Sequence, residues 1–431
     1  MLFIYNLLIN LVIILSPFII FFRLVKKKED FLRFKEKFCF FSEKNLTKKK
    51  LIWFHGASVG EILSIIPLVE KLEKNKSIGK ILITSTTLSS SKVLKKYKLK
   101  KTIHQFFPID SKFFTKKFLN YWKPSITIFI ESEIWPNMII NVKRKNIPLI
   151  LLNARISSKT FKRWKLLNNF SNFLFEKFDL CIAQSTETKN YLNSLGAKKI
   201  NSIGNLKFSE SKYDSKVSVN KAFAKQFGNR KIWCASSTHA DEELDCAKVH
   251  LSLIKKHKNL LTIIIPRHIH RTNEIQNKLG NLGLNVTCRS SNKKISKSTN
   301  IYLVDTYGET KKFYKYSKTV FLGGSLSSSV KHGGQNPIEP ARLGSTIIHG
   351  PNINNFKEVY KLFNDKKISF KAKNLYELKK LVNRSIIKSI NNKNKFLKIK
   401  KIGTKILDKT YNEIKYYIKN NENKKTKILG L

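Results

Sequence analysis

Carboxylates and glycines stand where the sequence predicts that apolar strands end. The first such motif, HGASVGE at residues 55–61, directly follows the apolar run Leu51–His55. A strand, a glycine-containing turn and a helix start would place Glu61 at the carboxyl end of a parallel strand, where ligands bind in open α/β sheets. A carboxylate there can act as a general base on a hydroxyl group. Ser58 and Glu61 also fit a capping box, and the residues alone favour that structural role.

A second motif, ESEIWPN at residues 131–137, follows the apolar run Ile126–Ile130. Its carboxylates Glu131 and Glu133 could bind a cation, position a sugar or cap the next helix, and their spacing leaves these alternatives open. Arg155 ends the following strand and could bind a phosphate or a carboxylate.

The second half of the chain repeats this pattern with groups suited to anions. The motif ASSTH at residues 235–239 leads from a strand into a helix, whose N-terminal N–H groups and dipole favour phosphate. Thr238 could instead be a helix N-cap. Arg267 ends the next strand and could bind a phosphate or a sugar carboxylate, and the motif DTYGE at residues 305–309 ends another.

The most specific stretch begins with Gly323, Gly324 and Ser325 and continues with HGGQNPIEP at residues 332–340. Glycines let a backbone approach a ligand closely because they lack a Cβ atom. Asn336 and Glu339 add an amide and a carboxylate at a helix start. Enzymes that bind nucleotide-sugars need N–H groups for phosphate and a carboxylate for ribose hydroxyls, so this stretch favours function over a structural turn.

Apolar runs of strand length alternate with amphipathic stretches of helix length, which predicts parallel sheets covered by helices on both faces. The predicted strands are 51–55, 81–85, 103–107, 126–130, 148–153, 180–183, 231–235, 261–266, 300–304, 319–322 and 346–349, with helices at 59–74, 160–178 and 240–256 between them.

A chain of 431 residues is long for one hydrophobic core. We therefore expect an α/β protein with two Rossmann-like domains, at 29–208 and 220–390, a linker at 209–219, and a C-terminal helix and basic tail at 391–431.

The N-terminus has the length and composition of a membrane anchor. Leu2–Phe22 carries no charge and would span about 30 Å as a helix. Arg23 and Lys26–Lys28 follow at once, so the positive-inside rule places the rest of the chain in the cytoplasm. Residues 1–28 are therefore predicted to be an anchor, and a cleaved signal peptide fits poorly because the charges flank the wrong end.

The charge and the cysteines of the chain say less about its function than the motifs do. The chain has 83 Lys and Arg against 29 Asp and Glu, a formal net charge of +54, which suits a polyanionic partner or reflects compositional drift. The five scattered cysteines predict reduced thiols in a cytoplasmic domain.

Taken together, the motifs resemble those of the 3-deoxy-D-manno-octulosonic acid (Kdo) transferases, which are GT-B glycosyltransferases. The resemblance includes the N-terminal anchor and extends over nearly the whole chain. It is carried by HGASVGE (55–61), ESEIWPN (131–137), NARIS (153–157), IGNLKF (203–208), ASSTH (235–239), PRH (266–268), DTYGE (305–309), GGSLSSSVKHGGQNPIEPARLG (323–344) and HGPNINNF (349–356).

This resemblance implies two Rossmann-like domains facing a cleft, with the acceptor bound by residues 29–208 and the donor by residues 220–390. It implies transfer of Kdo from CMP-Kdo to the lipid A precursor lipid IVA, in lipopolysaccharide core biosynthesis at the inner membrane. Inversion of the anomeric centre, with no metal and no cofactor, is implied as well. Glu61 is implied as the general base, with Ser58, Gly60, Glu131, Glu133 and Arg155 on the acceptor side and Ser237, Thr238, Arg267, Gly308, Glu309, Gly324, Ser325, Asn336 and Glu339 on the donor side.

Two other functions fit parts of the pattern. A GT-B enzyme that uses a UDP-sugar and another lipid acceptor would share the architecture. A basic, membrane-tethered nucleic-acid-binding protein would share the charge, but the sequence has no recognisable nucleic-acid-binding module, so no nucleic acid partner is expected.

Overall fold

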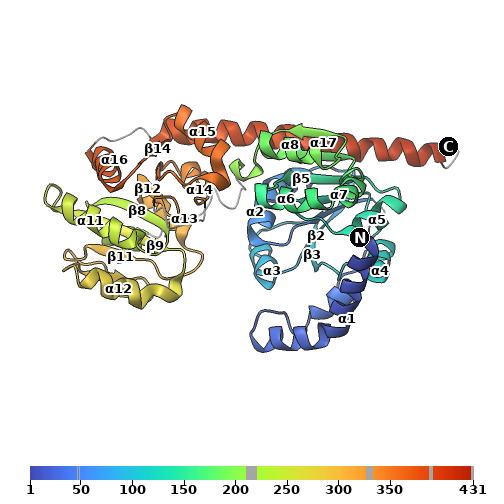
Figure 1. Ribbon diagram of the computed structural model, residues 1–431, viewed down its shortest axis with the longest axis horizontal. Helices are drawn as coiled ribbons and strands as arrows, with labels where there is room; N and C mark the ends of the chain where they lie inside the picture. Colours follow the sequence, from blue (N-terminus) through green and yellow to red (C-terminus); the bar gives the residue numbers. More distant parts are fainter. Residues whose placement is uncertain (46, 48, 210–220, 327–332, 388–391, 429–431) are drawn as a thin grey trace. The chain divides into compact units, whose positions relative to one another are not determined.

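The computed structural model describes residues 1–45, 47, 49–209, 221–326, 333–387 and 392–428, and it divides into two compact units (Figure 1). Unit 1 comprises Met1–Tyr213 and Gly403–Leu431, and unit 2 comprises Asp214–Ile402. Each unit contains one parallel seven-stranded sheet of Rossmann type, which confirms the predicted α/β class. Residues 210–219 of the predicted linker lie outside the described residues.

The sheet of unit 1 has the strand order β3-β2-β1-β4-β5-β6-β7, and all neighbouring strands are parallel. The order reverses between β1 and β4, which makes the carboxyl ends of these two strands the topological switch point. Its strands are β1 (Lys50–His55), β2 (Ile78–Ser85), β3 (Thr102–Phe106), β4 (Ile126–Ile130), β5 (Leu149–Ala154), β6 (Leu180–Ala183) and β7 (Ile200–Ser202).

Helices follow the strands of unit 1, and several begin at a hydroxyl side chain that accepts a backbone N–H, as Ser58, Thr87, Ser111 and Ser185 do. The predicted single helix over 160–178 is wrong, because Leu167 separates two helices. The helices are α2 (Val59–Leu72), α3 (Leu88–Leu94), α4 (Lys112–Trp122), α5 (Pro136–Arg144), α6 (Ser158–Leu166), α7 (Asn168–Phe175) and α8 (Thr186–Ser194), with 3-10 turns η1 (Phe34–Phe38) and η2 (Leu206–Phe208).

The sheet of unit 2 has the order β10-β11-β9-β8-β12-β13-β14 and is also parallel throughout. Its switch point lies between β8 and β12. The strands are β8 (Lys231–Thr238), β9 (Leu260–Pro266), β10 (Val286–Cys288), β11 (Ile301–Leu303), β12 (Thr319–Leu322), β13 (Thr346–His349) and β14 (Ser369–Lys371).

The helices of unit 2 pack their apolar faces on this sheet, where Trp233, Leu253 and Phe321 belong to one buried cluster. They are α10 (Lys221–Phe227), α11 (Glu242–Ile254), α12 (Thr272–Gly280), α13 (Thr310–Tyr316), α14 (Ile338–Arg342), α15 (Lys357–Asp365) and α16 (Leu375–Ile387), with 3-10 turns η3 (Ile269–Arg271) and η4 (Asn354–Phe356).

The C-terminal helix α17 (Asn392–Ile428) begins in unit 2, and its residues from Gly403 onward belong to unit 1. In unit 1, Asn201 Nδ2 donates to Glu413 Oε1 at 2.8 Å. A Cβ atom on Gly403 would stand 2.3 Å from the carbonyl oxygen of Phe208, so only glycine allows the helix to approach so closely.

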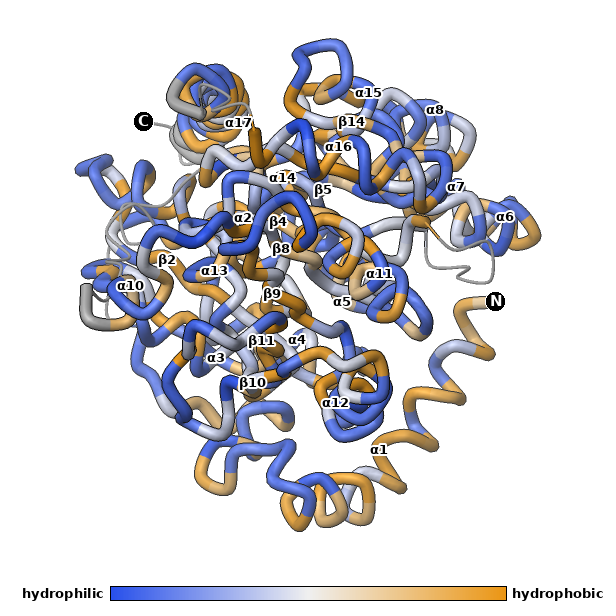
Figure 2. Tube along the Cα trace, turned by 90° about the vertical axis from the view of Figure 1, so that its left-hand side faces the viewer, coloured by the Kyte–Doolittle hydropathy of each residue, from blue (hydrophilic) through white to orange (hydrophobic). Residues whose placement is uncertain are grey.

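The N-terminal helix α1 (Leu2–Val25) is mostly apolar (Figure 2). Most of its large side chains are exposed. Within the described residues it is the one helix long and apolar enough to cross a membrane. Near its start, Tyr5 Oη donates to Asp110 Oδ2 at 2.7 Å, and near its end Arg23 Nε pairs with Glu29 Oε2 at 2.9 Å. Both ends of α1 therefore contact other residues of unit 1.

Candidate active site

Motifs that are distant in the sequence meet at the switch point of each sheet. In unit 1, residues 55–61 follow β1 and residues 131–137 follow β4. In unit 2, residues 235–239 complete β8 and residues 323–325 follow β12. Ligands bind at this position in open α/β sheets because the helix N-termini and connecting loops converge there. Each unit therefore offers one candidate ligand site.

Glu61 completes a capping box and still has one carboxylate oxygen to spare. Its Oε2 accepts the N–H of Ala57 at 2.6 Å and that of Ser58 at 3.3 Å, while Ser58 Oγ accepts the N–H of Glu61 at 3.3 Å. The capping box predicted as a structural role is thus confirmed. In the described part of the chain, Oε1 of Glu61 has no hydrogen-bond partner. The cap and a proton transfer can therefore use different oxygens of one carboxylate.

The surroundings of Glu61 favour a base that works near neutral pH. Burial, and then the charges of Glu133 and Glu131, raise the pKa of Glu61 to about 7, although the hydrogen bonds with Ser58 act in the opposite direction. A Cβ atom on Gly56 would stand only 3.1 Å from Glu61 Cβ, so the glycine leaves room for this side chain at the end of β1. A general base is most effective when its pKa lies close to the working pH.

Glu133 is held by ring nitrogens of His55 and Trp135. His55, which is fully buried, places Nε2 at 3.1 Å from Glu133 Oε2 and Nδ1 at 3.0 Å from Thr84 Oγ1. Trp135 Nε1 donates to the same Glu133 oxygen at 2.8 Å. Burial by itself would raise the pKa of Glu133, but His55 and then Trp135 bring it below its usual value. Glu133 therefore stays ionised beside Glu61.

Glu131 is buried and pairs with a lysine from another motif. Lys207 Nζ lies 2.6 Å from Glu131 Oε1, and Asn153 Nδ2 donates to the same oxygen at 3.4 Å. Glu131 and Asn153 have φ values of 56° and 52°, a conformation that costs energy in residues other than glycine and that clusters at functional sites. The helix-cap interpretation of Glu131 and Glu133 is wrong, because the N-cap of α5 is Trp135 and no side chain caps it.

The remaining predicted acceptor residues line the same strand ends. Ser58 and Gly60 are exposed in the first turn of α2. Arg155 is half-buried after β5, where its N–H donates to the carbonyl of Glu131 at 3.2 Å and its carbonyl accepts from Ser132 Oγ at 2.6 Å. The backbone of Arg155 thus ties the loop after β5 to the loop after β4.

The site of unit 2 is organised by a carboxylate that the sequence analysis did not single out. Glu242 is fully buried at the start of α11 and accepts the N–H groups of His239 at 3.0 Å, Gly324 at 2.7 Å, and Ser325 and Leu326 at 3.2 Å. The amides of Gly324 and Ser325, which were expected to approach the donor, thus already have an internal partner. Glu242 joins the turn after β8 to the loop after β12.

The end of β8 is irregular. Ser237 has a φ of 56° and lies at a break in the pairing with β9, and the buried Thr238 follows it. The N-cap of α11 is Asp241, so the interpretation of Thr238 as the cap of this helix is wrong.

Arg267 offers a cation at the carboxyl end of β9. Its N–H donates to the carbonyl of Thr238 at 2.9 Å, and its exposed guanidinium has no partner among the described residues. This group can therefore bind an anion at the edge of the unit 2 sheet without first breaking an ion pair.

Gly308 and Glu309 form the turn after β11. Gly308 has a φ of 80°, while Glu309 binds Arg289 Nε at 3.0 Å, Thr306 Oγ1 at 2.6 Å and Lys312 Nζ at 3.0 Å. The hydrogen bond from Arg289 is the largest of several effects that lower the pKa of Glu309 to about 2. Glu309 is therefore ionised and already paired.

Asn336 and Glu339 stand at the start of α14. Asn336 Oδ1 accepts the N–H of Ile338 at 3.1 Å, and Glu339, half-buried, lies 3.6 Å from Lys311 Nζ. Residues 327–332, which include His332 of the predicted motif, lie outside the described residues.

Three residues without an assigned role in the sequence analysis contact the predicted ones: His55, Lys207 and Glu242. His55 and Lys207 stand inside motifs, so the motif boundaries were a signal for them. No sequence pattern connects Glu242 with Gly324, because 82 residues separate them and only the pairing of β8 with β12 brings them together.

Comparison with known proteins relates this chain to one enzyme family. Residues 32–210 match the family described as 3-deoxy-D-manno-octulosonic-acid transferase (kdotransferase). The 3-deoxy-D-manno-octulosonic acid transferase of Rickettsia bellii is 34% identical over 360 residues, which are 84% of this chain and 85% of the relative. The corresponding enzyme of Haemophilus influenzae is 31% identical over 361 residues, 82% of this chain and 83% of the relative.

Among solved structures, UDP-GlcNAc 2-epimerase from Neisseria meningitidis bound to UDP-GlcNAc aligns with a TM-score of 0.55 at 14% identity. The alignment covers 84% of this chain and 100% of that one. At this identity the likeness concerns the fold alone, and it agrees with two Rossmann-like sheets.

Proposed function

This chain belongs to the 3-deoxy-D-manno-octulosonic acid transferase family, and from that premise we propose that it transfers Kdo from CMP-Kdo to the lipid A precursor lipid IVA. The proposal includes inversion at the anomeric carbon of Kdo and a reaction that requires no metal ion. It places this step in lipopolysaccharide core biosynthesis.

The observation that carries the proposal is the state of Glu61. Its Oε2 is fixed by the backbone of the preceding turn, its Oε1 is left for a substrate, and its pKa is about 7. In the transfer, a sugar hydroxyl of the acceptor attacks the anomeric carbon of Kdo and gives its proton to Glu61 Oε1. The bond from the anomeric carbon to the phosphate oxygen breaks, and CMP leaves with the electron pair.

The charge that develops on departing CMP needs a cation, and Arg267 supplies one at the carboxyl edge of the unit 2 sheet. A positive group at this position stabilises the negative charge of the leaving phosphate electrostatically. Glu339 and Asn336, at the start of α14, are the proposed partners of the nucleotide, together with Ser237, Thr238 and Gly308.

The proposal is tested by transfer from freshly generated CMP-Kdo to tetraacylated lipid A precursor, with UDP-sugars in parallel. We expect product only from CMP-Kdo. Transfer from a UDP-sugar and none from CMP-Kdo would establish the alternative donor class. The anomeric configuration of the product, read by NMR, tests inversion, and activity in the presence of EDTA tests metal independence.

Arg267→Gln is expected to lower the kcat/KM for CMP-Kdo by roughly 10- to 100-fold, because a hydrogen bond to a charged group is worth about 1.5–3 kcal/mol. Steady-state kinetics at saturating acceptor measures this change. Arg163→Gln, an exposed arginine of α6, makes the same charge change and is expected to leave kcat/KM unaltered. Equal effects of both variants would mean that only overall charge matters.

We further propose that α1 binds the inner membrane and that the rest of the chain faces the cytoplasm, in agreement with Arg23 and Lys26–Lys28 at the C-terminal end of α1. The contact of Tyr5 with Asp110 joins the start of α1 to unit 1, as in a helix that lies in the membrane surface. The helix is nevertheless mostly apolar and, at 24 residues, long enough to cross the bilayer.

Leu11→Glu with Phe18→Glu is expected to lower binding to phosphatidylglycerol vesicles by on the order of 100-fold or more, because charges in an inserted helix are costly. Both side chains are exposed in α1, and flotation of the full chain with vesicles measures the effect. Leu166→Glu, an exposed leucine of α6, is the control. A protease added on the side of the catalytic units distinguishes the two arrangements of α1. Removal of an N-terminal tag would place α1 in the membrane surface, and a protected tag would show that α1 crosses the bilayer.

A further inference from the structure

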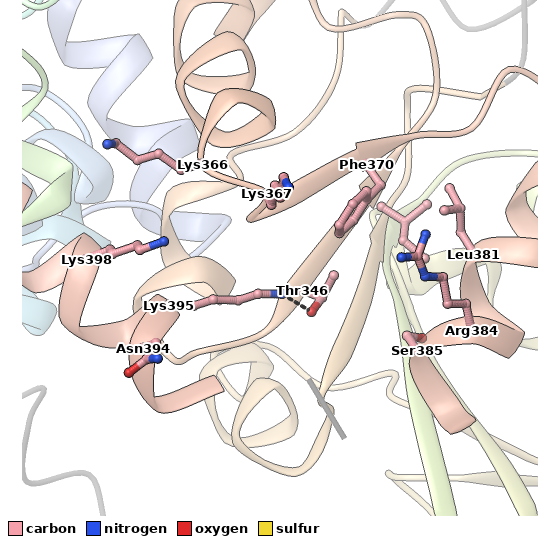
Figure 3. Close-up of a pocket in the computed structure, with 11 residues that line it drawn as sticks. Thr346, Lys366, Lys367, Phe370, Leu381, Arg384, Ser385, Asn394, Lys395 and Lys398 are labelled. Carbon is pink, nitrogen blue, oxygen red and sulfur yellow. Dashed lines mark hydrogen bonds between the residues drawn. The ribbon is translucent and has the colours of Figure 1, made fainter. Parts of the chain in front are cut away.

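A basic cavity in unit 2 lies near the amino ends of β13 and β14, away from the candidate active site at the carboxyl ends of the strands. It has a volume of about 310 Å³ and opens near Thr346, the first residue of β13, and near Lys366 and Lys367, just before β14. The predicted donor residues instead follow the carboxyl ends of the strands. None of those donor residues lines the cavity, whose lining residues are drawn in Figure 3, so the cavity is separate from the site described above.

Five cations line the cavity: Lys366, Lys367, Arg384, Lys395 and Lys398. No ion pair of these five with a carboxylate is found in the part of the chain that the structure describes. Figure 3 shows that they come from three segments: the turn before β14, helix α16 and the first turns of α17. Like charges that lie together without a carboxylate partner repel one another, and an anion bound among them would reduce this repulsion.

Lys395 is the central residue of this cluster. Only 8% of it is exposed, and its Nζ donates to Thr346 Oγ1 at 2.6 Å. Burial, and then the charge of Lys398, lower the pKa of Lys395 to about 8. A buried ammonium group normally has a carboxylate or phosphate partner, and Thr346 supplies only a neutral one.

The walls of the cavity are largely apolar. Ile348, Phe370 and Leu381 line it beside the aliphatic stems of the lysines. Its volume is in the range of sites for small ligands. Apolar walls with a cationic rim suit a ligand that has an anionic head and a hydrocarbon portion, and a free inorganic anion would use only the rim.

We propose that this basic cavity binds a phosphate-bearing anion with a short apolar portion, through Lys395, Lys398 and Arg384, and that its occupation holds the first turns of α17 on the sheet. The phosphate belongs to a lipid headgroup or to a soluble phosphate ester. The proposal does not depend on the transfer reaction, because none of the residues proposed for transfer lines the cavity.

The test is calorimetric titration of the full chain with monomeric dihexanoyl phosphatidic acid, in saturating CMP so that the candidate donor site is filled. Inorganic phosphate and dihexanoyl phosphatidylcholine are titrated in parallel. We expect phosphatidic acid to bind at one site per chain and phosphatidylcholine to bind at least tenfold more weakly. Equal binding of inorganic phosphate would overturn the role of the apolar portion, and absence of binding by both phosphates would overturn the whole proposal.

Two variants assign the binding to the cavity. Lys366→Gln with Lys398→Gln removes two exposed rim charges and is expected to weaken binding at least tenfold without altering the fold. Lys361→Gln with Lys373→Gln removes two exposed charges of unit 2 that do not line the cavity, and it is expected to leave binding unchanged. Equal weakening by both pairs would mean that the anion binds only through the general positive charge, and the proposal would fail.

Discussion

Glu61→Gln is expected to lower the kcat for Kdo transfer by roughly 10²–10⁴-fold, the usual contribution of a general base. The amide oxygen of Gln can still accept the N–H groups of Ala57 and Ser58, as Oε2 of Glu61 does, so the helix cap is retained. The amide cannot take the proton of the attacking hydroxyl. Transfer from CMP-Kdo to lipid A precursor measures the loss, while circular dichroism and CMP binding show that the variant is folded.

The pH dependence of wild-type kcat/KM should carry the signature of the same group. Glu61 acts as a base only when ionised, and its pKa is about 7. We therefore expect kcat/KM to rise about tenfold per pH unit below 7 and to level off above it.

The same pKa shift affects stability. Since the raised pKa favours the protonated form in the folded protein, ionisation of Glu61 lowers the stability of the protein as the pH rises from the pKa of this group in the unfolded chain to about 7. The Gln variant should therefore be at least as stable as the wild type at pH 8.

Ser185→Ala is the control that removes a helix cap without removing a candidate base. Ser185 Oγ accepts the N–H of Thr188 at the start of α8, so its removal should cost about 1 kcal/mol of stability. Transfer should nevertheless continue, because α8 carries none of the proposed site residues.

The outcome that would contradict the base assignment concerns Glu61→Gln. If that variant retains near-normal transfer, Glu61 is only a cap, and Glu131 or Glu133 becomes the candidate base.

Glu242→Gln is expected to destabilise unit 2 by roughly 2–4 kcal/mol and to weaken CMP binding at least tenfold. The carboxylate accepts four N–H groups with two oxygens, and the variant would turn an NH₂ group toward some of these donors. Buried donors left without an acceptor cost about 1–3 kcal/mol each, partly recovered when the loops relax. Urea denaturation and titration with CMP measure the two effects.

The matched control is Glu274→Gln, in the same unit. Glu274 forms exposed pairs with Arg271 and Lys278, and solvent screens such pairs strongly. We expect this variant to unfold at nearly the wild-type urea concentration and to bind CMP normally. If Glu242→Gln behaves in the same way, the loops at Gly324 and His239 hold their conformation without the carboxylate, and our account of the unit 2 site is wrong.

The sequence alone was sufficient to predict the central strands and the places where they end. Runs such as Ile126–Ile130 are buried on both sides, so every residue is apolar or small, and the predicted ranges differ from the observed ones by a few residues at most. The edge strands β7, β10 and β14 were not predicted. Each has three residues and is only partly buried, and so short a run carries too little apolar signal.

The sequence also identified Glu61 through its motif, but it could not choose between a cap and a base. The structure confirms the cap, which uses Oε2, and it leaves Oε1 available for the proposed base. The pKa of about 7 depends on burial and on Glu131 and Glu133, about 70 residues away, which lie nearby because β1 pairs with β4.

Strand order therefore decides which motif residues act on one another. Local sequence determines that a carboxylate follows a strand, since the apolar run and the turn are contiguous in the chain. Whether that carboxylate faces another carboxylate, as Glu61 does, or the N–H groups of a distant loop, as Glu242 does, is settled only when the sheet assembles. Burial and electrostatic neighbours are properties of that assembly, and they give the two carboxylates different chemistry.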